Sequence, residues 1–177
     1  MKILVTGSNG FIGKNLIADL KATTDHEILE FDIDTDISLL DEYCKEADFV
    51  FNFAGVNRPL NPDEFESGNV SFPEKLLATL EKYDNKCPVM VSSSVQASLE
   101  GRYEGSVYGA SKLKGEELFF EYSKRTDAKV LVYRFCNIFG KWSKPNYNSA
   151  VATFCHNIAN DLPVNITDRN IELGLLY

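Results

Sequence analysis

The sequence predicts a doubly wound α/β domain, and two features of its hydrophobic pattern carry that prediction. Runs such as residues 2–7 and 48–55 are more continuously apolar than a strand with one wet face would be. The segments between such runs place apolar residues at helical spacing, as at positions 12, 16, 17 and 20. Strands that are each followed by a helix describe a parallel sheet covered on both faces.

The alternation predicts five strands and five helices in order along the chain. The expected strands cover residues 2–7, 27–34, 48–55, 88–94 and 129–135. The expected helices cover residues 11–24, 38–47 and 73–83, a segment containing residues 108–112, and residues 151–158. After Gly140 the alternation loosens, so we divide the chain into residues 1–140 and 141–177. It stops within an expected strand, which we interpret as part of a longer polypeptide.

Composition argues against several classes of partner. With 177 residues, 44% of them hydrophobic, the chain can bury one full core. A net charge of −8 without any basic run argues against binding nucleic acid or an anionic membrane. We find neither a membrane span nor a signal peptide, and the four cysteines lack C-x-x-C spacing, as reduced thiols do. These features predict a cytoplasmic protein. His26 and His156 are isolated and lack ligand spacing, so we expect no metal site.

A glycine-rich segment, TGSNGFIG at residues 6–13, joins the first expected strand to the first expected helix. Glycines there allow a tight turn, close backbone approach to a diphosphate, and packing of the helix on the sheet. The amides at the start of the helix face the anion. Its position between a strand and a helix favours a dinucleotide cradle over a plain turn. The predicted cradle comprises Gly7, Asn9, Gly10, Phe11, Ile12 and Gly13.

An acidic cluster follows about twenty residues after the glycines, at the end of the second expected strand. Asp32 is placed to accept the ribose hydroxyls of a dinucleotide, and Asp34 is an alternative acceptor because the interval from Asp32 to Asp36 is short. These carboxylates would repel a 2′-phosphate. Electrostatics alone therefore favours NAD over NADP.

Tyr108 and Lys112 lie four residues apart in VYGASK, so on a helix they share one face. A phenol with a pKa of about 10 is a poor proton donor at neutral pH, and a nearby ammonium group stabilises its phenolate. Gly115 and Phe119 continue the same face, which turns the pair toward the interior. We therefore interpret the pair as catalytic rather than as a solvated turn of helix.

Seven motifs in order resemble the extended, nucleotide-sugar-modifying branch of the short-chain dehydrogenase/reductase superfamily. They are TGSNGFIG, DI at 36–37, FAG at 53–55, NV at 69–70, SSS at 92–94, YGASK at 108–112 and RFCNIFG at 134–140. More narrowly, AGVNRP, GNVS and FGKWSKPNYNSAVATFC resemble the bifunctional reductases of bacterial capsular-polysaccharide synthesis, in which a cupin domain follows the reductase domain. The resemblance implies an NAD(P)-binding Rossmann domain at residues 1–140 and a truncated sugar-nucleotide-binding region at 141–177.

The resemblance also implies roles for individual residues. Tyr108 would protonate the substrate carbonyl as hydride arrives from the nicotinamide, and Lys112 would also reach the nicotinamide ribose. Ser94 would hydrogen-bond the same carbonyl oxygen, because strand alternation turns Ser93 to the opposite face. Further implied cofactor contacts are Asp36, Ile37, Phe53, Ala54, Gly55 and Ser92. The implied sugar-nucleotide contacts are Asn137, Arg58, Lys144 and Asn148, although Arg58 and Lys144 are equally well explained as solvated loop charges.

The motifs also bear on the reaction. Related 4,6-dehydratases carry an Asp-Glu pair after the strand serine, and SVQA at residues 94–97 lacks it, so dehydration is disfavoured. The narrower resemblance favours NAD(P)H-dependent reduction of a UDP-linked 4-keto-6-deoxy-HexNAc in capsular or surface polysaccharide synthesis. An NAD-dependent nucleotide-sugar 4-epimerase shares the motifs, and a dinucleotide-binding sensor or scaffold without turnover is an alternative of another class.

The resemblance and the sequence together give three further expectations, about the cofactor, the assembly and the substrate loop. The capsular enzymes imply NADPH, against the charge argument for NAD, so the cofactor choice stays open. By analogy with this branch, we expect a homodimer formed through two helices of each subunit. Tyr108 follows Ser94 by only fourteen positions, which predicts a short and mobile substrate loop.

Overall fold

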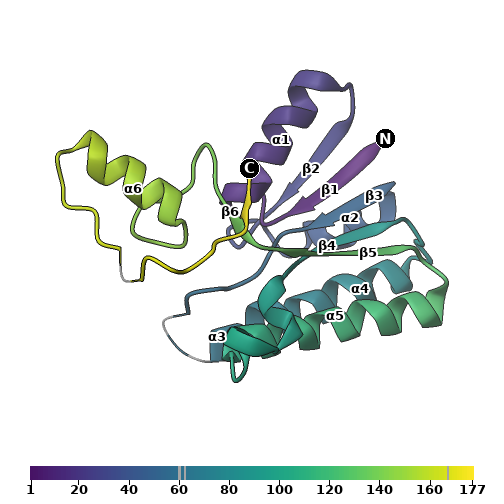
Figure 1. Cartoon of the computed structure of the whole chain (residues 1–177). Coiled ribbons are helices and arrows are strands. Elements are labelled where there is room, and N and C mark those ends of the chain that lie inside the picture. The colour runs from purple at the N-terminus through teal and green to yellow at the C-terminus, as the bar shows by residue number, and fades with distance from the viewer. Residues whose placement is uncertain (60, 62, 167) are drawn as a thin grey trace. The chain divides into compact units, whose positions relative to one another are not determined.

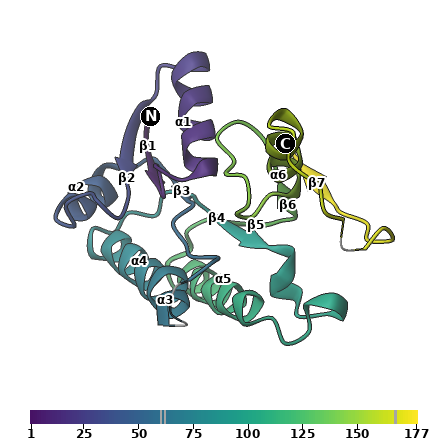
Figure 2. The same cartoon turned by 90° about the vertical axis from the view of Figure 1, so that its left-hand side faces the viewer.

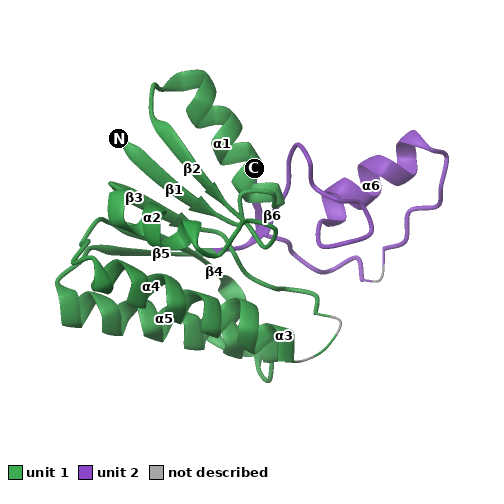
Figure 3. Ribbon diagram, turned by 180° about the vertical axis from the view of Figure 1, so that it is seen from behind, with its two compact units in different colours: residues 1–134 green, residues 135–177 purple. Residues whose placement is uncertain are grey.

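The computed structural model describes residues 1–59, 61, 63–166 and 168–177. They form two compact units, residues 1–134 and residues 135–177, which Figure 3 colours separately. The two compact units meet between Arg134 and Phe135, and the functional division at Gly140 stays a prediction from the sequence pattern. Strand β6 (Asn137–Ile138) pairs with β7 (Leu175–Leu176), so the segment before Gly140 belongs to the second unit.

A five-stranded sheet forms the centre of the first unit, in the order β2-β1-β3-β4-β5 (Figure 1). Its strands are β1 (Lys2–Thr6), β2 (Glu27–Phe31), β3 (Phe49–Asn52), β4 (Val89–Ser94) and β5 (Val130–Phe135). Strand β1 pairs in parallel with β2 and β3, and β3 pairs in parallel with β4. The chain moves outward from β1 to β2 and then crosses back to β3. The predicted doubly wound fold is confirmed, and its switch point lies between β1 and β3.

Helices cover both faces of this sheet, as Figures 1 and 2 show. They are α1 (Phe11–Thr23), α2 (Leu39–Glu46), α4 (Phe72–Lys82) and α5 (Val107–Thr126). Because side chains alternate along a strand, β1 contributes to both layers. Ile3 and Val5 pack in the cluster that contains Ile17 of α1. Leu4 packs in the larger cluster formed with α2, α4 and α5.

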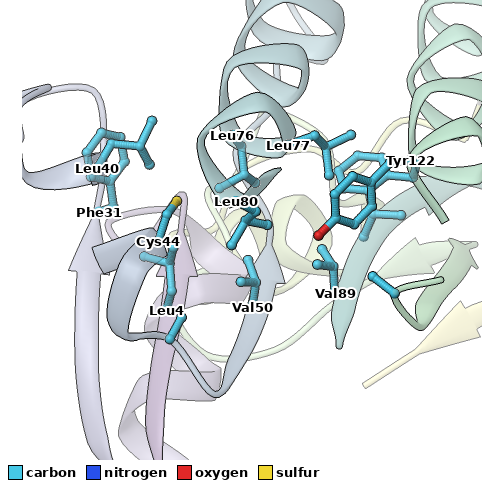
Figure 4. Close-up of a cluster of buried hydrophobic side chains, with 14 of the residues drawn as sticks. Leu4, Phe31, Leu40, Cys44, Val50, Leu76, Leu77, Leu80, Val89 and Tyr122 are labelled. Carbon is cyan, nitrogen blue, oxygen red and sulfur yellow. The ribbon is translucent and has the colours of Figure 1, made fainter. Parts of the chain in front are cut away.

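The larger core holds the helices against the sheet, and Figure 4 shows its central side chains. Leu40 of α2 and Leu80 of α4 belong to the same buried cluster as Val50 of β3. Tyr122 of α5 is also buried, and its hydroxyl donates to the backbone oxygen of Asn85 over 3.1 Å. Each buried leucine contributes about 1.5–3 kcal/mol. This layer therefore fixes where the two ends of α5 lie relative to the strands.

Two connections near the carboxyl ends of the strands carry helical turns that the hydrophobic pattern did not predict. Helix α3 (Asp63–Glu66) and the π-helical turn η1 (Ser67–Ser71) precede α4. The 3₁₀ turns η2 (Val95–Ser98) and η3 (Gly101–Tyr103) fill the connection between β4 and α5. That connection was expected to be a short substrate loop. It is short, and much of it is folded into these two turns.

The second unit contains the β6–β7 pair and helix α6 (Ala150–Ala159), close to the helix expected at residues 151–158. The Ser149 hydroxyl begins this helix by accepting a hydrogen bond from the amide of Ala152 at 3.3 Å. Across the described ranges of both units, none of the helices has the length and apolar character needed to span a bilayer.

Candidate active site

Two of the three glycines in the segment of residues 6–13 are required by packing. Gly7 has a φ of +68°, and a Cβ there would lie 2.7 Å from backbone atoms of Phe53 and Ala54. A Cβ on Gly13 would overlap the carbonyl oxygen of Gly7. The end of β3 therefore passes directly against the glycine turn, and the first turn of α1 is folded back onto it.

Gly10 is different, because a Cβ at this position would make a tight contact but would not overlap the backbone. A Cβ on Gly10 would meet the Gly7 carbonyl oxygen at 3.1 Å, and its φ of −72° suits any residue. Gly10 begins α1 without a side-chain cap, and the first turn carries no acidic residue. The first-turn amides of a helix lack partners within the helix and favour an anion. The geometry therefore fits the diphosphate of a dinucleotide.

Asp32 lies beside the glycine turn. Its carboxylate accepts hydrogen bonds from the amides of Asn9 at 2.7 Å and Ile33 at 2.8 Å. The side-chain amide of Asn9 donates to Asp34 at 3.2 Å. Both candidate ribose acceptors are thus held near the same residue of the cradle.

Asp36 and Ile37 occupy the next turn of the chain. The Asp36 carboxylate accepts from the amide and the hydroxyl of Ser38, at 2.9 and 2.8 Å, and these bonds lower its pKa. Its carboxylate therefore has a structural partner immediately before α2. The Ile37 side chain is exposed.

The FAG segment after β3 connects the cradle to the interior. Phe53 stacks on Phe51 with ring centroids 5.9 Å apart, and the Ala54 amide donates to the Thr6 hydroxyl at 3.3 Å. A Cβ on Gly55 would lie 2.8 Å from Oδ1 of Asn69 and 3.4 Å from Nζ of Lys112. Gly55 therefore lets the ammonium group of α5 approach the end of β3.

Tyr108 is positioned by the start of α5. The Ser106 hydroxyl accepts from the Gly109 amide at 2.9 Å and donates to the Gln96 side chain, also at 2.9 Å. A Cβ on Gly109 would overlap the carbonyl oxygen of Gln96, so α5 packs tightly against η2. The turn after β4 and the first turn of α5 thereby bring Ser94 close enough to Tyr108 for its hydroxyl to lower the pKa of the phenol.

The pKa of Tyr108 differs in direction from the expectation. We expected Lys112 to lower the pKa of Tyr108, whereas burial raises it and the nearby Ser94 hydroxyl only partly offsets that effect. Phe65 contributes to the enclosure, with its ring centroid 6.0 Å from that of Tyr108. In the ligand-free chain, removal of the phenol from water therefore outweighs its stabilising partners.

Lys112 lies one turn further along α5 and is partly buried. Burial lowers its pKa to about 8, and the charge of Glu116 acts in the opposite direction. A small cavity adjoins it, of about the size that one water molecule needs. The polar residues around this cavity are Asn52, Asn69, Ser92, Ser93, Lys112 and Glu116.

The three serines at the end of β4 have different partners. The Ser92 hydroxyl donates to the backbone oxygen of Asn52 at 3.2 Å, and the Ser93 hydroxyl donates to the Glu116 carboxylate. The Ser94 hydroxyl accepts from the Gln96 amide at 3.2 Å and also lies close enough to Tyr108 to lower the pKa of the phenol. Of the two candidate serines, Ser94 is the one beside the phenol.

Asn69 and Glu116 are site residues to which the sequence pattern assigned no role. The Asn69 side chain bonds both backbone groups of Val56, at 2.9 and 2.7 Å, and donates to the Ser111 hydroxyl at 2.9 Å. It thus ties η1 and the segment after β3 to α5. Glu116 is 2% exposed and lies four residues after Lys112. That spacing is visible in the sequence, but the pair Glu116–Glu117 resembles a solvated helix face.

The residues expected to bind the sugar nucleotide are less closely connected to this site. Arg58 is exposed in the segment after β3. Asn137, Lys144 and Asn148 belong to the second unit, where the Asn137 side chain donates to the Gly174 backbone oxygen at 3.1 Å. Lys144 and Asn148 are exposed. Their roles stay predictions from the resemblance.

Known proteins similar to this chain include a nucleotide-sugar reductase and a capsular polysaccharide assembling protein. A UDP-2-acetamido-2,6-beta-L-arabino-hexul-4-ose reductase of Pseudomonas aeruginosa is 41% identical over the whole chain, which spans 46% of that protein. The crystal structure of the capsular polysaccharide assembling protein CapF from Staphylococcus aureus superposes with a TM-score of 0.86 at 46% identity. It covers all of this chain, which spans 47% of CapF. The chain therefore spans less than half the length of these relatives.

More distant structures share the fold. The UDP-glucuronic acid 4-epimerase of Bacillus cereus, solved with NAD, superposes with a TM-score of 0.80 over 94% of this chain and 66% of its own, at 21% identity. The model of the NAD dependent epimerase/dehydratase family matches residues 3–170, which include the glycine turn, Ser94, Tyr108 and Lys112. This chain belongs to the NAD dependent epimerase/dehydratase family.

Proposed function

We propose that this chain forms the dinucleotide-binding and catalytic part of an NAD(P)H-dependent reductase of a UDP-linked 4-keto-6-deoxy-HexNAc. The observation that carries the proposal is the proximity of the Ser94 hydroxyl to Tyr108, one helical turn from the partly buried Lys112. The pair lies at the carboxyl end of β4, the edge at which parallel sheets bind ligands. The capsular relatives support the substrate class and a role in capsular or surface polysaccharide precursor synthesis.

Each of the three side chains has a distinct task in this reaction. A bound nicotinamide dinucleotide supplies the hydride that forms the new C–H bond at C4 of the sugar. Tyr108 gives its phenolic proton to the carbonyl oxygen, whose π electrons become the new O–H bond. Ser94 donates a hydrogen bond to the same oxygen. The Lys112 ammonium stabilises the phenolate that remains.

The cradle bears on the choice of dinucleotide. Asp32 and Asp34 are both held at Asn9, where a 2′-phosphate would meet two negative charges. This arrangement supports NADH, whereas the resemblance to capsular enzymes supports NADPH. The two expectations can be tested by measuring the dissociation constants of NADH and NADPH for the parent and for Asp32→Asn. Tighter NADH binding that weakens in the variant supports the charge argument.

Assembly and compartment are part of the same proposal. Helices α4 and α5 lie side by side, and Phe120 of α5 leaves 46% of its surface exposed, which supports a homodimer through these helices. The free thiols Cys44, Cys87, Cys136 and Cys155 support a reducing cytoplasm. Light scattering should give twice the subunit mass, and Phe120→Glu should give the single mass.

The test of the reaction uses the full-length protein, a UDP-4-keto-6-deoxy-HexNAc and either reduced dinucleotide. A reductase oxidises one dinucleotide for each sugar reduced, so loss of absorbance at 340 nm should match the product seen by NMR. Interconversion of 4-epimers without net oxidation would instead identify the epimerase. Dinucleotide binding without any turnover would identify a sensor or scaffold.

A further inference from the structure

Glu116 is a buried carboxylate that the chemistry above leaves without a task. It lies four residues after Lys112 on α5, so the two side chains extend from the same face of the helix. Both contribute to the walls of the small cavity at the carboxyl end of the sheet. The Glu116 side chain is 1% exposed, which makes solvent a negligible partner for its charge.

The carboxylate is held by groups from two neighbouring strands. Arg134 of β5 donates to both of its oxygens, through Nε at 2.9 Å and through Nη2 at 2.6 Å. The Ser93 hydroxyl of β4 donates to the same carboxylate. A bidentate pair of this kind fixes orientation as well as charge. Arg134 itself reaches solvent, with 42% of its side chain exposed.

The other groups around Lys112 explain why this carboxylate matters. Asn52 of β3, Asn69 of η1, and Ser92 and Ser93 of β4 surround the same cavity and are uncharged. Among the described residues that line this cavity, Lys112 and Glu116 are the charged ones, and Arg134 of β5 pairs with Glu116. Tyr108 lies one turn before Lys112 on α5. Tyr108 is neutral in its resting state. Glu116 therefore supplies the negative charge that opposes the burial of the ammonium group.

We propose that Glu116 is a positioning residue that keeps the Lys112 ammonium charged beside Tyr108, while Arg134 and Ser93 hold Glu116 in place. The proposal deepens the reductase function and rests on it, because the charge of Lys112 affects turnover only if Tyr108 transfers a proton. The protonation of Lys112 can nevertheless be measured independently of the reaction, because the lysine titrates with or without substrate.

Two isosteric variants distinguish this role from a purely structural ion pair. Glu116→Gln removes the negative charge near Lys112, so the ammonium should lose its proton at lower pH. Arg134→Gln removes the positive charge that neutralises Glu116, so Lys112 should lose its proton at higher pH. If the Glu116–Arg134 ion pair only joined α5 to β5, both variants would shift the pH at which Lys112 loses its proton in the same direction.

The measurement is the NMR titration of lysine ¹³Cε signals in the labelled chain, with Lys112 identified by the signal lost in Lys112→Arg. We expect Glu116→Gln to lower the Lys112 midpoint by about one pH unit, a tenfold loss of proton affinity. Arg134→Gln should raise it. The matched control is Glu117→Gln, which removes an exposed carboxylate from the same helix and should leave the midpoint unchanged.

An unchanged midpoint in Glu116→Gln, or equal downward shifts in both variants, would overturn the proposal. If Glu116→Gln fails to fold, Arg134→Gln decides alone, and a midpoint that is not raised overturns it. Alcohol oxidation by the full-length protein provides the kinetic readout. Alcohol oxidation needs the ionised Tyr108 as proton acceptor, so its rate should rise with pH. Because a charged Lys112 stabilises the Tyr108 phenolate, the midpoint of this rate profile should move up in Glu116→Gln and down in Arg134→Gln. Expected NMR shifts without turnover in the parent would refute the reductase function and leave the electrostatic role standing.

Discussion

The glycine turn and the polar cluster of Ser93, Lys112, Glu116 and Arg134 lie at the same edge of the sheet, but different interactions determine their residues. At the turn, backbone sterics decide the residue type, because side chains at Gly7 and Gly13 would overlap backbone atoms. At the cluster, side chains from α5, β4 and β5 share one buried set of hydrogen bonds. The first region is therefore encoded locally, whereas the second depends on how distant segments meet.

Within the glycine turn, Gly7 is required by the fold, whereas we expect Gly10 to be required mainly for dinucleotide binding. Gly7→Ala should lower the free energy of unfolding by about 4 kcal/mol, because it combines a left-handed backbone with contact against the end of β3. Gly10→Ala is the matched control and should change it by less than about 1 kcal/mol while weakening dinucleotide binding. Urea unfolding and cofactor titration measure the two effects. Equal destabilisation by both substitutions would refute the distinction.

Because the cluster contains a partly buried lysine, the free energy of unfolding should depend on pH. Since burial lowers the pKa of Lys112 from 10.5 to about 8, the charged lysine costs about 3 kcal/mol. This cost is present in full below pH 8 and is relieved as the pH rises from about 8 toward 10.5. Lys112→Met should therefore be more stable than the parent at pH 7, and the difference should shrink by pH 10. A difference that is independent of pH would contradict this.

The ion pair in the cluster should contribute more than one at the surface. Arg134→Gln leaves the Glu116 carboxylate buried without its cation, and we expect a loss of about 2 kcal/mol, moderated because Arg134 is partly exposed. Arg125→Gln, which breaks the exposed pair with Glu81, should leave the denaturation midpoint unchanged. Parallel urea titrations of the two variants make the comparison. Similar midpoints for both would mean that the buried pair adds nothing.

The sequence predicted the parts of the site that depend on local pattern. The strands, the main helices and the glycine turn follow from hydrophobic period and glycine spacing, and they lie close to their expected positions. The helical segment from Asp63 to Ser71 lacks an apolar stripe and was not predicted. The role of Glu116 requires knowing that Ser93 and Arg134 lie on adjacent strands. Likewise, the raised pKa of Tyr108 depends on enclosure by groups such as Phe65, which periodicity does not reveal.

The most direct test of the account is single-turnover hydride transfer in the full-length protein, comparing the parent with Tyr108→Phe. The substitution removes one hydroxyl and keeps the ring that packs on Phe65. We predict that the rate constant for reduction of the 4-keto sugar falls by about 10²–10⁴-fold, while the dinucleotide dissociation constant changes by less than about threefold. Equal rate constants in the two proteins would contradict the assignment of Tyr108 as the proton donor.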